Sequence, residues 1–239
     1  MPQPSNQFNA LAYFDKTLAA KYDRRIRLFC PSYDALHQML VPWLASMPEH
    51  SLFLSAGAGT GAEILTLGTQ FPSWRFIAVD ISPDMLTACR QRLLTAGLET
   101  RVTFFNGSLQ EYQPQELVDA ASSVFVSHFI KDREEKLSYF RSIATNLRPG
   151  GMFILADLFG DKKTREFSTL FNTWLGSYAA HEVSTEDLKQ SRTHIEKDIS
   201  FIPEADLFTL LSEAGFSAPI RFYQCYLFGG WVATKEAQH

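Results

Sequence analysis

Residues 52–65, LFLSAGAGTGAEIL, place three glycines between an apolar run and an amphipathic stretch. The run 52–56 has the length and composition of a buried strand, and the residues after the glycines favour a helix. Glycine is needed where a backbone turns tightly or where a flat ligand approaches it without meeting a Cβ atom. Gly57, Gly59 and Gly61 therefore mark either a ligand site or a tight turn without a ligand.

Asp80 is a second sign of a ligand. It closes the next predicted strand, residues 75–80, and follows Gly61 by 19 residues. In folds of alternating strands and helices, a carboxylate at this place reaches the two hydroxyls of a ribose. The glycine turn also fits the dinucleotide pattern GxGxxA, ending at Ala62, so a nicotinamide cofactor is a competing interpretation.

Composition indicates one folded domain. The chain has 239 residues, of which 46% are hydrophobic and 20% charged, enough for a full-sized core. The longest uncharged apolar stretches, 120–130 and 222–234, are shorter than the roughly 18 residues of a membrane span, so no membrane contact is expected. The start, MPQPSNQFNA, lacks the pattern of a secretory signal, which favours a cytoplasmic protein. A net charge of -4 makes nucleic acid an improbable partner, although tRNA is not excluded.

The rest of the chain alternates apolar runs with helical stretches, which predicts an α/β fold with a mostly parallel sheet. Further strands are expected at 102–106, 121–127, 152–157, 220–226 and 230–234, and further helices at 8–22, 32–44, 83–97, 132–146 and 203–214. A single domain would contain a helical N-terminal segment (1–48), a core (49–160), a helical lid (161–200) and a C-terminal helix with a strand pair (201–239).

Four motifs resemble those of the class I S-adenosylmethionine (SAM) dependent methyltransferases. They are GAGTG at 57–61, VDISPDML at 79–86, NGSL at 106–109 and LRPGGMFILAD at 147–157. The flanks, YFDKTLAAKYD at 13–23 and AGFSAPIRFYQCYLFGGWVATK at 214–235, resemble the branch that contains the carboxy-SAM synthase of tRNA wobble-uridine modification and related small-molecule methyltransferases. The resemblance implies a Rossmann-like fold whose seven-stranded mixed sheet has one antiparallel strand.

The resemblance also implies a site for SAM across the carboxyl ends of the strands. Asp80 would accept the ribose hydroxyls, and Tyr22 would close over the methionine tail. The other implied cofactor contacts are the glycines Gly57, Gly59 and Gly61 beneath the methionine and ribose, Ile81, Met85, Ser108 and Leu109 around the adenine, and Ser127 at the reaction chamber beside His128.

Three positions depart from the family pattern. Ser55 stands where an acidic residue usually helps to hold the cationic amino group of SAM, and Ser108 where an acidic residue often meets the adenine. A hydrogen bond to a charged group contributes roughly 1.5–3 kcal/mol, so SAM would bind one or two decades more weakly unless another group substitutes. Carboxy-SAM synthase is expected to hold the carboxylate of its cofactor with an arginine four residues before the AGF turn. This chain has Leu210 at that position, so the sequence favours ordinary SAM as the cofactor.

His128 is the candidate catalytic residue. Methyl transfer is an in-line displacement, for which the protein aligns the acceptor and, for an oxygen acceptor, removes a proton. His128 follows the fourth predicted strand at the ligand edge, where it is either a base or a packed wall histidine. Aromatic candidates for the acceptor site are Tyr13, Phe14, Trp174, Tyr178, Tyr223 and Tyr226, and basic ones are Arg24, Arg25, Arg27 and Arg192.

The sequence thus favours a methyltransferase that acts on a small-molecule acceptor at oxygen or nitrogen. The alternatives are a carboxy-SAM synthase-like or tRNA-modifying enzyme, and an inactive binding module marked by Ser55 and Ser108. A metal is not expected, because the six histidines show no ligand spacing, and the three cysteines are expected to be reduced. The aromatic lid and final strands could supply a homodimer face.

Overall fold

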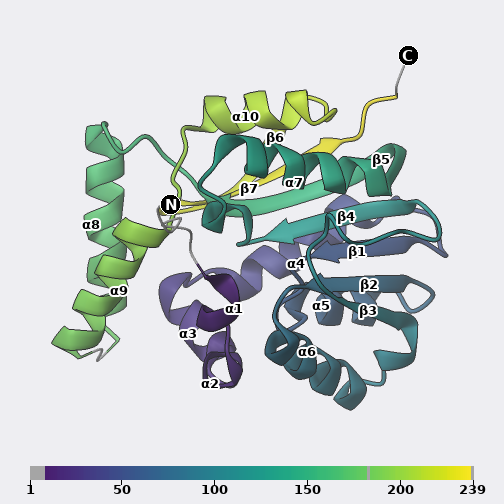
Figure 1. Ribbon diagram of the computed structural model, residues 1–239, viewed down its shortest axis with the longest axis horizontal. Coiled ribbons are helices and arrows are strands. Elements are labelled where there is room, and N and C mark those ends of the chain that lie inside the picture. The colour runs from purple at the N-terminus through teal and green to yellow at the C-terminus, as the bar shows by residue number, and fades with distance from the viewer. Residues whose placement is uncertain (1–8, 182–183, 238–239) are drawn as a thin grey trace, which may run out of the picture.

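The computed structural model describes residues 9–181 and 184–237, which form one seven-stranded sheet (Figure 1). The strand order is β3-β2-β1-β4-β5-β7-β6, and β7 is antiparallel to both of its neighbours. The predicted α/β fold with one antiparallel strand is therefore confirmed. The strands are β1 Leu52–Ala56, β2 Arg75–Asp80, β3 Val102–Asn106, β4 Val118–Val124, β5 Leu147–Leu158, β6 Ile220–Cys225 and β7 Phe228–Thr234.

Helices cover both faces of the sheet. Figure 1 shows α7 (Arg133–Asn146) and α10 (Glu204–Glu213) on one face, and α4 (Tyr33–Leu44), α5 (Ala62–Gln70) and α6 (Pro83–Thr95) on the other. Alternate residues of β1 enter the two cores: Leu54 packs towards α7, and Phe53 packs towards α5. Because both faces are covered, the central strands β1 and β4 are buried along their whole length, as expected of parallel strands.

Several helix ends follow from capping residues that the sequence displays. Ser82 caps α6 by accepting a hydrogen bond from Met85 N, with Pro83 at the first helical position. Asp132 caps α7 in the same way by accepting from Glu135 N. The predicted starts of both helices are confirmed.

The N-terminal segment differs from the single helix predicted over 8–22, whose first residue, Phe8, lies outside the described residues. The segment consists of α1 (Ala10–Tyr13), α2 (Lys16–Ala19) and α3 (Tyr22–Phe29). Asp15 breaks the run, because its side chain accepts from Leu18 N and so starts a new helix. The prediction of one helix was wrong for this reason.

The fourth strand was predicted at 121–127 but lies three residues earlier, at 118–124. The start of β4 was missed because Asp119 is charged, and a charged residue beside an apolar run favours a loop in a sequence-based prediction. Its carboxylate is buried, accepts from Leu52 N at 2.8 Å and pairs with Arg148 at 2.6 Å. Phe125, with φ of 59°, ends the strand, and Ser127 begins the short 3-10 helix η2 (Ser127–Phe129).

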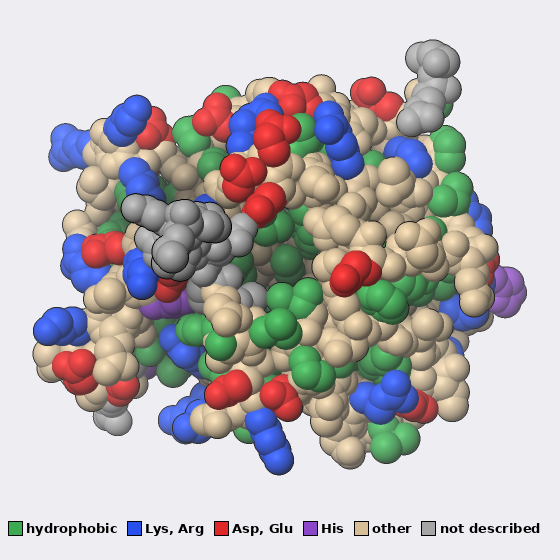
Figure 2. All heavy atoms as spheres, in the orientation of Figure 1, with side chains coloured by type: hydrophobic (Ala, Val, Ile, Leu, Met, Phe, Trp, Pro, Cys, Tyr) green, Lys and Arg blue, Asp and Glu red, His purple; other side chains and the backbone are tan. Residues whose placement is uncertain are grey.

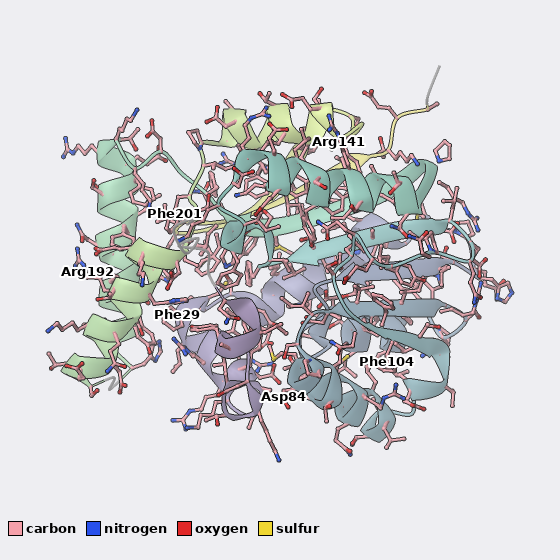
Figure 3. All side chains as sticks on the ribbon, in the orientation of Figure 1. Phe29, Asp84, Phe104, Arg141, Arg192 and Phe201 are labelled. Carbon is pink, nitrogen blue, oxygen red and sulfur yellow. The ribbon has the colours of Figure 1, made fainter. Side chains whose placement is uncertain are left out.

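Two helices stand beyond the carboxyl edge of the sheet. These are α8 (Arg165–Ala179) and α9 (Thr185–Asp198), within the range predicted as a lid. In Figure 1 they lie at the same end of the molecule as α1, α2 and α3, and Figure 3 shows Phe29 of α3 and Phe201 on this side. Within the described ranges, no helix is both long and apolar enough to cross a membrane.

Two thiols meet where the N-terminal segment joins the sheet. Cys30 caps the C-terminus of α3 and lies 3.2 Å from the Tyr223 hydroxyl, which also bonds Ser32 at 2.7 Å. Cys225 follows on the same strand, and hydrogen bonds from Cys30 and Ser32 lower the pKa of its thiol to about 6. The described cysteines are all free, and Cys225 is partly exposed.

We predict that Cys225 is the fast-reacting thiol of this protein. Because its pKa is depressed to about 6, it is mostly thiolate at pH 7, and its alkylation by iodoacetamide should change little between pH 7 and 8.5. An ordinary thiol gains about tenfold over that interval. Peptide mass spectrometry over a pH series measures this rate, and Cys30→Ala, which removes the hydrogen-bond donor, should shift the profile towards higher pH. A profile for Cys225 like that of a free cysteine would contradict the prediction.

Candidate active site

A cavity of about 300 Å³ opens at the carboxyl edge of the sheet, where β1, β2, β3 and β4 end. Figure 2 shows a recess in the middle of this face with hydrophobic side chains around it. The cavity has the size of a small-molecule or cofactor site. Eight of the predicted site residues line it: Tyr22, Gly57, Gly59, Asp80, Ile81, Met85, Ser108 and Leu109.

The glycine turn forms the floor of this cavity. Gly57 N and Ala58 N both donate to Val79 O, which ties the turn to the end of β2. Gly59 has a φ of 52°, and a Cβ atom there would meet only the Met85 Cε, at 3.8 Å. The turn therefore leaves an open approach to its backbone at Gly59, as a bound ligand requires.

Asp80 holds the turn from the second strand. Its carboxylate accepts from Gly59 N at 2.8 Å and from Ser82 N at 2.9 Å. Burial raises the pKa of Asp80, and the two backbone donors only partly offset that effect. Each carboxylate oxygen has accepted one hydrogen bond and retains a lone pair, so the side chain can still accept two hydroxyl groups. These features fit the ribose of an adenosyl cofactor.

Three predicted residues are not part of this cavity wall. Gly61 caps α5 with φ of 78°, and a Cβ atom there would lie 2.5 Å from Cys89 Sγ, so this glycine permits α5 to pack on α6. Ser127 is buried and donates to Asp157. His128 lies in the wall of a neighbouring cavity.

The neighbouring cavity has a volume of about 90 Å³ and is mainly aromatic. It shares four wall residues with the first cavity, namely Phe14, Tyr22, Phe125 and Phe129, so the two adjoin. Of the aromatic residues predicted around an acceptor, Tyr13, Phe14 and Trp174 line it, whereas Tyr178, Tyr223 and Tyr226 do not. Tyr178 instead stacks on Phe29, with ring centroids 4.1 Å apart.

Asp157 is the partner of His128 and was not predicted as a site residue. It lies near the end of β5, and its carboxylate bonds His128 Nδ1, Ser127 Oγ and Leu158 N. Burial alone would raise the pKa of Asp157, but attraction to His128 and to the buried Lys136 holds it below its ordinary value. The sequence did contain a signal for Asp157 as a site residue, because it is an acidic residue at the carboxyl end of the strand predicted at 152–157.

Glu63 is a second carboxylate that the sequence did not single out. It projects from the first turn of α5, where an acid usually serves the helix terminus. Instead it is only 4% exposed and accepts from Ser55 Oγ at 2.7 Å and from Ser122 Oγ at 3.2 Å. A carboxylate is thus present beside Ser55, supplied by the facing helix.

Of the four arginines predicted as acceptor candidates, two form ion pairs with acidic side chains and one lines the aromatic cavity. Arg27 forms a two-pronged pair with Asp34, with both N–O distances at 2.8 Å, and Arg192 pairs with Glu196. Arg25 lines the aromatic cavity, 5.5 Å from the centre of the Phe29 ring.

Comparison with known proteins agrees with this fold. Residues 53–151 match the family described as methyltransferase domain. Carboxy-SAM synthase from Klebsiella pneumoniae (strain 342) is 24% identical over 231 residues, 94% of this chain and 92% of the relative, and that of Pectobacterium atrosepticum is 27% identical over 234 residues, with the same shares. Magnesium protoporphyrin IX methyltransferase from Synechocystis PCC 6803, solved with bound SAH (S-adenosylhomocysteine), superposes with a TM-score of 0.66 at 17% identity, over 95% of this chain and 98% of that one.

The fold and the match over residues 53–151 are those of a methyltransferase domain. Over nearly its whole length the chain is similar to carboxy-SAM synthases, and it shares the fold of a methyltransferase that was solved with bound SAH.

We predict that Gly61 matters for folding through its contact with Cys89. Gly61→Ala and Gly97→Ala both place a Cβ at positive φ, which costs about 1–2 kcal/mol, but Gly97 has open space around it. Gly61→Ala should lose at least about 1 kcal/mol more, because its Cβ overpacks the helix interface. Urea unfolding of both variants measures the difference. Equal losses would mean that the contact with Cys89 has no effect.

Proposed function

We propose that the protein transfers the methyl group of SAM to a hydroxyl oxygen of a small, planar acceptor bound in the aromatic cavity. The observation that carries this proposal is the buried His128–Asp157 pair, in which a carboxylate orients a histidine in the wall of the adjoining aromatic cavity. A methyl acceptor that carries a hydroxyl group needs such a base, whereas a neutral amine does not.

The first cavity supplies the cofactor end of the site. SAM, when bound, presents its methyl group on a sulfonium sulfur. In the proposed arrangement Asp80 accepts the ribose hydroxyls, Gly57 and Gly59 lie under the chain that links ribose and methionine, and Ile81 and Met85 flank the adenine. Ser108 and Leu109 meet the adenine edge, and Tyr22 stands between the two cavities.

His128 acts as the base in this proposal. Its Nδ1 bonds the Asp157 carboxylate, so Nδ1 carries the ring hydrogen and Nε2 retains a lone pair for the cavity. Nε2 takes the hydroxyl proton as the acceptor oxygen gains the methyl group, and Asp157 stabilises the positive ring that results. Ser127 and Leu158 N fix the carboxylate from the other sides.

The walls of the aromatic cavity suit a flat acceptor. Phe14, Phe125 and Phe129 belong to the walls of both cavities, so the boundary between the two is mainly aromatic. Aromatic faces favour a planar ring by offset or edge-to-face packing. Arg25 at the same wall favours an acceptor with an anionic substituent.

A second candidate is synthesis of a carboxylated SAM derivative, which the names of the relatives suggest and the cationic Arg25 favours. Against it, Leu210, which occupies the position of the expected arginine, is 4% exposed in the core between the sheet and α10. Mass spectrometry of ligand released from the purified protein separates the two. Carboxy-SAM would support the second candidate, and SAM or SAH the first.

Asp80→Ala should weaken SAM and SAH binding tenfold or more, because the ribose hydroxyls lose a buried charged acceptor. Asp84→Ala is the matched control, since Asp84, labelled in Figure 3, lies in the first turn of α6 and is not in the cavity wall. Calorimetric titration of native protein and both variants measures the dissociation constants. An unchanged affinity in Asp80→Ala would contradict the ribose assignment.

The catalytic pair is tested by turnover. Native protein, SAM and a panel of small phenols, including catechol and 4-hydroxybenzoate, are assayed for SAH formation by liquid chromatography. With the accepted phenol, His128→Ala should lower kcat by about 10²–10⁴ and leave SAM affinity unchanged. Asp157→Asn should lower kcat by a similar order, because the ring loses its orienting carboxylate.

His50→Ala is the control for this pair, since His50 is exposed and lies outside both cavities. It should retain most of the turnover. If His128→Ala turns over as fast as native protein, or if no phenol of the panel is methylated, the proposed hydroxyl chemistry is wrong.

A further inference from the structure

Glu63 is a buried carboxylate without a cationic partner at hydrogen-bond distance. Its Oε1 accepts from two serine hydroxyls, and its nearest basic atom is His37 Nε2, 3.9 Å from Oε2. No lysine or arginine in the described part of the chain forms an ion pair with it. Burying an ionised carboxylate is expensive unless a positive group is close, so a cationic ligand group would be favourable at this site.

His37 adds a second observation at the same place. It is 3% exposed, and its Nδ1 bonds the Tyr33 carbonyl oxygen at 2.8 Å. A carbonyl oxygen only accepts, so Nδ1 donates, and Nε2 is left without a hydrogen-bond partner while it faces Glu63. In the neutral ring, Nε2 and Glu63 Oε2 are two acceptors facing each other, an arrangement that a donor with several hydrogens would satisfy.

This polar cluster lies next to the cofactor cavity. Ser55, which donates to Glu63, ends β1 two residues before Gly57 in the cavity floor. Tyr22, in the cavity wall, is close enough that the charge of Glu63 adds to burial in raising the pKa of its hydroxyl. Glu63, His37 and Ser55 are not themselves in the cavity wall, so the cluster lies behind the glycine turn, connected to the cavity through Gly57 and Tyr22.

We infer that Glu63 binds the ammonium group of the cofactor and takes over the role that an acidic residue at position 55 has in the family. The inference rests on the proposed cofactor arrangement. In this chain the negative charge is on α5 and not at the end of β1, and Ser55 orients the Glu63 carboxylate by donating a hydrogen bond to it. The ammonium has three donors, which Glu63 Oε2 and His37 Nε2 can share.

The test compares two ligands that differ only in the group Glu63 would bind. SAH carries the amino acid chain, and 5′-methylthioadenosine has the same adenosine and thioether sulfur without it. Glu63→Gln should weaken SAH binding tenfold or more, measured by calorimetry, and change 5′-methylthioadenosine binding by less than twofold. Glu213→Gln, which removes a surface carboxylate paired with Arg133, should change neither.

A second variant, in which the carboxylate is placed on β1, separates the loss of the charge at Glu63 from any loss of protein stability. Ser55→Asp/Glu63→Ala returns the carboxylate to β1 and should recover most of the SAH affinity that Glu63→Gln loses. Equal losses for both ligands, no loss for SAH, or no recovery in the relocated variant would each overturn the assignment of Glu63. Native protein that binds neither ligand would overturn the cofactor arrangement as well.

Discussion

The active-site end of this molecule depends on one carboxylate. Asp80 accepts backbone hydrogen bonds from Gly59 and Ser82 and so ties the glycine turn after β1 to the loop after β2. The N-terminal segment then docks on both loops: Ser82 Oγ donates to Phe14 O at 2.6 Å, and Asp23 binds Thr60 and Arg92. The N-terminal segment, which contributes Phe14 and Tyr22 to the cavity wall, is therefore held by the same two loops that form the cavity floor.

The raised pKa of Asp80 shows that these contacts do not fully compensate its burial. In its charged form, Asp80 therefore lowers the stability of the folded chain, a cost that appears as the pH rises through the unfolded pKa. Glu63 is a second buried carboxylate beside the same cavity, without an ion-pair partner among lysines and arginines of the described residues. A ligand with hydroxyl groups and a positive charge would supply hydrogen bonds to Asp80 and a counter-charge to Glu63. Part of its binding energy would then come from two carboxylates whose burial is not fully compensated without it. Asp157 differs, because hydrogen bonds from His128 and Ser127 and attraction to the buried Lys136 outweigh its burial and hold its pKa below the ordinary value.

Local sequence signals predicted the part of the fold near the glycine turn well. The first three strands were predicted to the residue, because each is a short apolar run bounded by turn or capping residues. The fourth was displaced because Asp119, a charged residue inside the run, is buried by contacts with Leu52 and Arg148, which are distant in sequence. Glu63 and Asp157 were missed for a related reason: their surroundings come from other segments, and a carboxylate with distant partners looks like a solvent-exposed one in the sequence.

The two cavities differ in how many segments build them, which explains why the sequence points to the cofactor and not to the acceptor. The cofactor wall comes mostly from loops that follow successive parallel strands, so its residues appear in a fixed order as short motifs. The aromatic cavity is assembled from the N-terminal segment, η2, α8, α9 and β7. Each contributes one or a few side chains that could equally be core residues, as Tyr178 and Tyr223 are. Only the assembled structure separates Trp174, in the cavity wall, from Tyr178, one turn further along the same helix and outside it. If the aromatic cavity binds the acceptor as proposed, single substitutions on these segments would change the choice of acceptor while the cofactor motifs stay as they are.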